Sequence, residues 1–177
     1  QLGYDARKFH EILQYLRRQD LDVPLIGNLF VLTYPAARLM KENRLPGCVV
    51  TDGLLAELER ERSLPDKGVE ARLLRAAKMY ALLKGMGFSG VHIGGHPLTY
   101  EHVETIIEKG EALSASWETL VPEFHHPLPG GFYCFAGDPD RGLNGSLPAE
   151  PENRAYELPA SSLALYRFSR FVHNLFF

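Results

Sequence analysis

Two short apolar runs, set between helical patterns, constrain the fold of this chain more than any other feature of its sequence. Residues 23–32 form the first run, and their β-branched and aliphatic content predicts a strand that is buried on both faces. Residues 90–94 form the second run, which predicts another buried strand. Strands that alternate with helices in this order favour parallel pairing with right-handed crossovers. The first part of the chain is therefore expected to have an α/β structure.

Three helices are expected around these runs. Asp5, Asp66 and Thr99 each precede a helical pattern, and their side chains are of the kinds that cap helices. Gly87 and Gly90 are expected to break the second helix before the second strand begins. Apolar stripes at helical spacing support all three helices: Phe9, Ile12, Leu13 and Leu16; Val69, Leu73, Ala77 and Tyr80; and Val103, Ile106 and Ile107, which are expected to point inward.

The sequence changes character beyond residue 113. Residues 114–161 are rich in proline, glycine and polar residues, and we expect a long extension with few regular elements, among them one short strand at residues 131–135. Residues 162–177 are expected to form an amphipathic helix. Its apolar stripe would be poorly solvated if free, so we expect it to lead into a further domain or to pack on another chain. The stripe consists of Leu165, Phe168, Phe171, Val172 and Leu175.

Composition argues against several classes of protein. The net charge of −3 gives no electrostatic footprint for nucleic acid, and no apolar run approaches the roughly 20 residues that span a bilayer. No cationic and apolar signal segment opens the chain. The two cysteines, Cys48 and Cys134, lie far apart in sequence, which fits a reduced compartment. We therefore expect a cytoplasmic protein with neither a nucleic-acid nor a membrane partner.

Five short motifs then point to a known family. They are QLGYD at residues 1–5, LDVPLIGN at 21–28, LPG at 45–47, DGL at 52–54 and GVH at 90–92. In order and spacing they resemble the C-terminal half of methylenetetrahydrofolate reductases, over residues 1–113. The resemblance implies the C-terminal portion of a TIM (β/α)8 barrel, followed by a loop-rich extension and a terminal helix. A complete barrel needs about 250 residues, and this chain has 177.

The resemblance also implies a flavoenzyme. Members of the family bind FAD, accept hydride from NADH or NADPH at the flavin, and pass it to the methylene carbon of 5,10-methylenetetrahydrofolate. In the family, the glutamate and the aspartate that assist this chemistry lie on the first and fourth barrel strands. Most residues that hold the FAD lie on strands before the sixth. No catalytic residue is therefore expected in this chain. It would need the N-terminal half of the barrel, from the same or a separate polypeptide, and would be inactive alone.

The sites of such barrels lie at the carboxyl ends of the strands. Three residues near strand ends in the earlier motifs are therefore candidates for binding the folate substrate. Gln1 matches the family glutamine that hydrogen-bonds the pterin ring. Asn28 follows Gly27 at a strand end, where its amide would face a ligand, although Gly27 and Asn28 would equally form a plain turn. Phe30 is expected to stack on a flat ring.

Three more candidates follow the second strand. Gly94 and Gly95 leave backbone amides bare for an anion or a planar ring, in a place where better-known family members have larger residues. His96 adds a candidate acid, base or donor, its alternative being a solvated or structural histidine. His92 within the strand is expected to point opposite to its neighbours, into the barrel interior, and to be satisfied by a nearby group.

No metal site is expected, because His125 and His126 are adjacent and lack the spacing of zinc ligands. The sequence also contains no Walker loop, no G-x-G-x-x-G and no nucleophile elbow. Two other functions stay open: a noncatalytic half-barrel that acts as an interaction or regulatory subunit, and a flavin-free barrel that binds a pterin for methyl transfer. Homo-oligomer formation is open as well.

Overall fold

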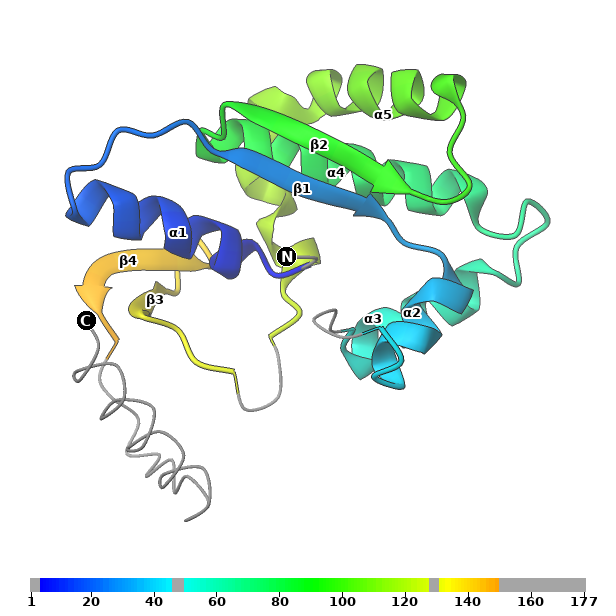
Figure 1. Ribbon diagram of the computed structural model, residues 1–177, viewed down its shortest axis with the longest axis horizontal. Helices are drawn as coiled ribbons and strands as arrows, with labels where there is room; N and C mark the ends of the chain where they lie inside the picture. Colours follow the sequence, from blue (N-terminus) through cyan, green and yellow to red (C-terminus); the bar gives the residue numbers. More distant parts are fainter. Residues whose placement is uncertain (1–3, 46–49, 128–130, 150–177) are drawn as a thin grey trace, which may run out of the picture.

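The computed structural model describes residues 4–45, 50–127 and 131–149, which form a mixed α/β structure (Figure 1). In chain order its elements are α1 (Ala6–Arg18), β1 (Ile26–Val31), α2 (Tyr34–Lys41), α3 (Asp52–Glu61), α4 (Val69–Met86), β2 (Gly90–Gly95), α5 (Tyr100–Leu113), the 3-10 segment η1 (Ser114–Phe124), β3 (Phe135–Asp138) and β4 (Leu143–Pro148).

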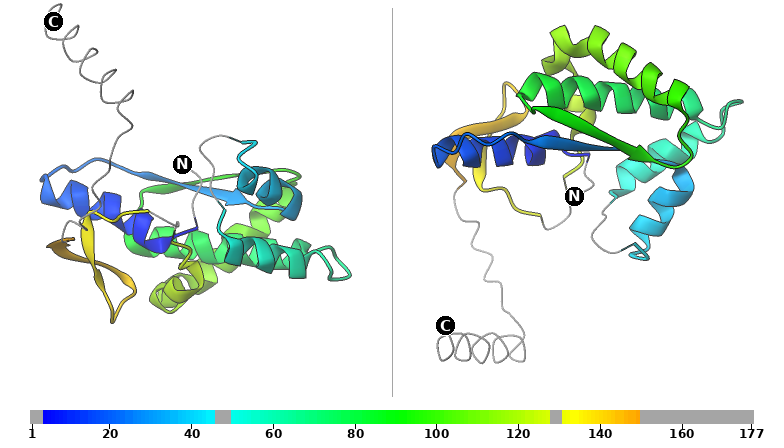
Figure 2. Two further views of the ribbon diagram at one scale, coloured as in Figure 1. Left: turned by 90° about the horizontal axis from the view of Figure 1, so that it is seen from below. Right: turned by 45° about the horizontal axis from the view of Figure 1, so that its top comes forward.

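The two expected strands pair in parallel, with Asn28 opposite His92 and Phe30 opposite Gly94. Helices α2, α3 and α4 lie between them in the chain, and α4 packs against β1, so that one face of the sheet is covered by helices (Figures 1 and 2). The expectation that the first strand is buried on both faces is wrong. Leu29 and Val31 are buried, whereas Ile26 is 64% exposed, because within the described residues no helix covers the opposite face.

The helix caps predicted at Asp5 and Thr99 are confirmed, whereas α4 is capped by Gly68 and not by Asp66. The Asp5 carboxylate accepts a hydrogen bond from the Arg7 N–H at 3.1 Å, and α1 begins at the next residue after Asp5. Thr99 begins α5 with a reciprocal pair of bonds to His102. Asp66 accepts from the N–H groups of two residues in the first turn of α4, although that helix begins three residues later, at Val69.

The core lies around α4, whose buried side chains meet β1, α5 and η1. Neighbouring side chains come closest to the helix backbone at two glycines. The Trp117 ring lies so near Gly85 that an added Cβ would be 2.1 Å from its Cγ, and a Cβ at Gly110 would be 2.5 Å from Tyr80 Cδ1. The stripes are only partly buried: Leu13 and Ile106 are inside, whereas Ile12 is 42% and Ile107 38% exposed.

The extension contains more regular structure than expected. Residues 114–124 form η1, whose Leu120, Val121 and Phe124 are buried. The strand expected at residues 131–135 begins only at Phe135, and it pairs antiparallel with β4, which the sequence pattern did not predict. Helix α1 packs on β4 (Figure 1). The helix expected at residues 162–177 lies outside the described residues. None of the helices in the described ranges has the length and apolar character needed to cross a membrane.

Candidate functional site

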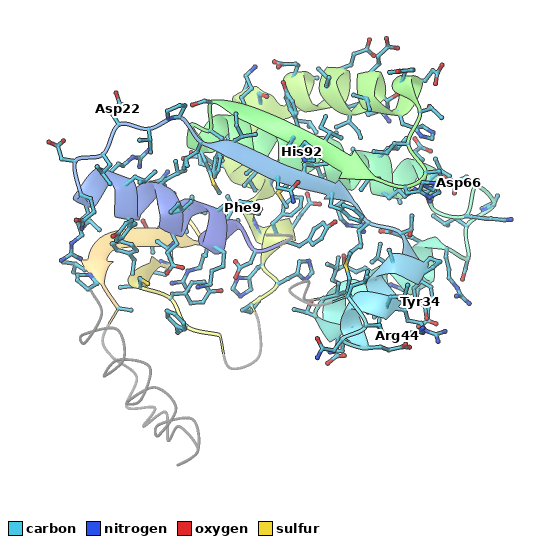
Figure 3. The ribbon with its side chains drawn as sticks, viewed as in Figure 1. Phe9, Asp22, Tyr34, Arg44, Asp66 and His92 are labelled. Atoms are coloured by element: carbon cyan, nitrogen blue, oxygen red, sulfur yellow. The ribbon has the colours of Figure 1, made fainter. Side chains whose placement is uncertain are left out.

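The open face of the β1–β2 sheet carries three of the predicted site residues. Because side chains at paired positions share a face, Asn28, Phe30 and Gly94 lie together with His92. Figure 3 labels His92 on this face. Asn28 Oδ1 lies 3.0 Å from His92 Nδ1, so a neighbouring group does satisfy this histidine. The expectation that His92 points into a barrel interior is wrong, because its side chain is exposed. An amide oxygen only accepts, so the imidazole Nδ1–H donates in this bond, and the Asn28 amino group, which is a donor, takes no part in it.

Gly94 keeps this face flat. A Cβ at Gly94 would lie 3.4 Å from His92 Cε1 and 3.8 Å from Phe30 Cδ2, so a larger residue would fill the space between the two rings. With glycine there, the edge of the imidazole and the phenyl ring form a shelf on which a planar ring can lie. The space beside Gly94 is therefore compatible with the planar ring expected there.

Of the remaining candidates, the structure describes Gly95 and His96. Gly95 has φ 141°, and its Cβ would come within 2.9 Å of the Val31 carbonyl oxygen, so the backbone alone accounts for glycine at this position. His96 is exposed in the loop between β2 and α5. Gln1 lies outside the described residues.

A cleft of about 750 Å³ opens between α1 and the first half of β1, and Asn28 joins it to the open face. Segments that are distant in sequence form the walls of the cleft. Figure 3 labels one lining residue, Phe9 on α1. The lining is mainly apolar and aromatic: Phe9, Ile12, Tyr15, Leu25, Ile26, Leu54, Phe88, Phe132 and Phe135. Its size and composition are those of a site for a small organic molecule or for a partner segment.

Polar groups gather at one end of the cleft. His126 Nδ1 lies 3.3 Å from Thr51 Oγ1, and burial lowers the pKa of His126, so the ring is neutral at pH 7. Asp5 accepts a hydrogen bond from the Tyr133 hydroxyl, and burial, followed by the Asp5 interaction, raises the pKa of Tyr133. The Thr51 hydroxyl and the His126 ring can both donate to and accept from a bound molecule.

Sequence reasoning missed the pairing of His126 with Thr51. The two residues are 75 positions apart, and no periodicity connects a loop after η1 to the cap of α3. In the ranges that the structure describes, no three His, Cys, Asp or Glu side chains stand close enough to hold a metal ion. The arrangement is therefore a flat, partly aromatic shelf next to an apolar cleft.

Comparison with known proteins adds no relative. No protein-family model, no curated protein and no solved structure matches this chain.

Proposed function

We propose that this chain forms the folate-binding side of a flavin-dependent methylenetetrahydrofolate reductase, as the C-terminal portion of its (β/α)8 barrel. In the complete enzyme, hydride from NAD(P)H reaches 5,10-methylenetetrahydrofolate through FAD and gives 5-methyltetrahydrofolate. The order and spacing of the five sequence motifs support this proposal. So does the parallel β1–α4–β2 unit, which is the repeating unit of such barrels.

One observation carries the proposal: Asn28, Phe30 and Gly94 share the open face of two parallel strands. The amino group of Asn28, which is outside its bond to His92, suits the acceptors at a pterin edge, and Phe30 beside Gly94 suits its flat face. FAD, when bound, supplies the hydride relay. The described residues form no phosphate cradle, so the proposal assigns FAD to the N-terminal half of the barrel and the folate to this half.

Substitution of two shelf residues tests the proposal in the complete enzyme. We expect Asn28→Ala and Phe30→Ala to lower kcat/KM for the folate by about 10- to 100-fold each, the loss of roughly 1 to 3 kcal/mol of polar or stacking interaction. Reduction of the flavin by NAD(P)H should stay at the parent rate. The exposed residue Glu104 on α5 provides the control, since Glu104→Gln should change neither half-reaction.

The two half-reactions also separate the competing functions. Loss of flavin reduction in both shelf variants would place these residues at the flavin instead of the folate. Pterin binding to an assembly without flavin absorbance would favour the methyl-transfer barrel. The apolar cleft favours a noncatalytic interaction module, and that function would be supported if the complete assembly bound neither flavin nor pterin.

A further inference from the structure

Helix α1 is attached to the described part of the molecule mainly through strand β4, and it touches α4 only lightly. The buried polar residue at this contact is Asn144, which is 2% exposed. Its side-chain amino group donates to the Arg7 carbonyl oxygen at 2.7 Å, and its Oδ1 accepts from Arg7 Nε at 2.9 Å. The Asn144 carbonyl oxygen accepts from the Gln14 side chain at 3.4 Å. Each of these three bonds joins the β3–β4 hairpin to α1. Phe132, Cys134 and Phe135 make further hydrogen bonds to Lys8, Glu11 and Arg7 on α1.

The fourth bond to Asn144 involves the one partner that gains a proton in mildly acidic solution. The Asn144 N–H donates to His10 Nδ1 at 3.2 Å, and His10 is only 4% exposed. Nδ1 accepts this bond through its lone pair, so the ring is neutral and carries its proton on Nε2. A second proton, on Nδ1, would make this nitrogen a donor that faces the Asn144 N–H, which is also a donor, in a buried contact.

The charged groups around His10 oppose that second proton. Arg17 lies on α1, and Arg141 lies in the turn between β3 and β4; both repel a charged imidazole, while Asp138 in β3 attracts it. Burial is the largest influence, and together with the two arginines it lowers the pKa of His10 to about 4.

We propose that the β3–β4 hairpin is an acid-releasable clamp on α1, with His10 as the group whose protonation opens it. Protonation removes the acceptor for the Asn144 N–H and buries a positive charge beside Arg17 and Arg141. The other Asn144 partners, Arg7 and Gln14, do not change charge in this range, so opening depends on losing the His10 bond and on the charge buried there. Phe135 begins β3 and lines the cleft, so opening of the hairpin changes the cleft on that side.

The direction of the pH effect follows from proton binding. An open hairpin leaves His10 near its ordinary pKa of 6.5, whereas the closed hairpin holds it at about 4, so the open form binds more protons between these values. The clamp is therefore at full strength above pH 6.5 and weakens as the pH falls toward 4. With these two pKa values the opening constant rises about 20-fold between pH 7 and pH 5.

Amide hydrogen exchange of the full chain tests the clamp, with protection factors used to remove the intrinsic pH dependence of exchange. We expect the protection of the Asn144 amide to fall about 20-fold between pH 7 and pH 5 in the parent. In His10→Gln the side-chain oxygen can still accept but cannot take a proton, so protection should stay constant over this range. The exposed residue His125 gives the matched control, and His125→Gln should behave like the parent.

An independent measurement keeps the proposal decidable if His10→Gln does not fold. The ring resonances of His10 in the parent should show a neutral Nε2–H tautomer that titrates far below 6.5. A His10 midpoint near 6.5, or an equal loss of protection in parent and His10→Gln, would overturn the clamp.

Discussion

At the scale of single residues, two glycines in helices serve packing instead of turns. Gly85 lies one residue before the end of α4, and Gly110 lies inside α5; each faces an aromatic ring. A helix interior normally disfavours glycine by about 1 kcal/mol relative to alanine. Here that loss is offset because the absence of a Cβ lets Trp117 and Tyr80 pack directly on helix backbone.

Replacement of glycine by alanine should therefore have opposite effects at a packed helix position and at an open one. We expect Gly85→Ala to lower the free energy of unfolding by about 1 to 3 kcal/mol, since the new Cβ would meet the Trp117 ring. Gly53 in α3 has nothing within 4 Å of its Cβ position, so Gly53→Ala should raise the free energy of unfolding by up to about 1 kcal/mol. Urea denaturation of both variants measures the difference, and equal stabilities would contradict it.

The candidate site was predictable only where residues share one short pattern. Asn28, Phe30 and Gly94 lie on one face because strands alternate every two residues and the pairing is parallel. The neighbour that satisfies His92 could be expected but not named, since its identity depends on register. The contact between His126 and Thr51 had no signal at all, because it depends on how the loop after η1 returns to α3.

At the scale of elements, local chemistry made the helix ends predictable. Thr99 Oγ1 accepts from the His102 N–H at 3.3 Å, and His102 Nδ1 in turn accepts from the Thr99 N–H at 3.3 Å. Both partners lie within four residues, so the sequence alone contains the interaction. The β3–β4 hairpin was not predictable in the same way, because its strands are short and α1 holds it through Asn144.

The α5 cap gives a prediction at this scale. We expect Thr99→Ala to destabilise the protein by about 1 kcal/mol, because the N–H of His102 loses its acceptor at the start of the helix. Thr99→Ser keeps the hydroxyl and should stay close to the parent. Amide exchange in the first turn of α5, together with urea denaturation, measures both effects. If serine and alanine at this position proved equally costly, the cap would contribute nothing.

At the scale of the whole molecule, the outer edge of β1 is the main unsatisfied feature of the described residues. The Leu25 carbonyl oxygen bonds to Ser89 on the β2 side, so the backbone groups of the next residue, Ile26, point to the other edge. Farther along that edge the Phe30 carbonyl oxygen accepts from the Tyr4 hydroxyl. The apolar cleft runs beside the same edge. An edge of this kind pairs readily with another strand.

The open edge predicts how the isolated chain behaves in solution. We expect it to self-associate with rising concentration, because Ile26 and its backbone groups offer both apolar surface and hydrogen bonds to a second strand. Ile26→Lys should reduce this association by placing a charge on the edge. Tyr100 is 88% exposed on α5, away from any strand, so Tyr100→Lys should associate like the parent. Sedimentation velocity over a range of concentrations measures all three proteins, and a parent that stays monomeric throughout would show that the edge is already covered.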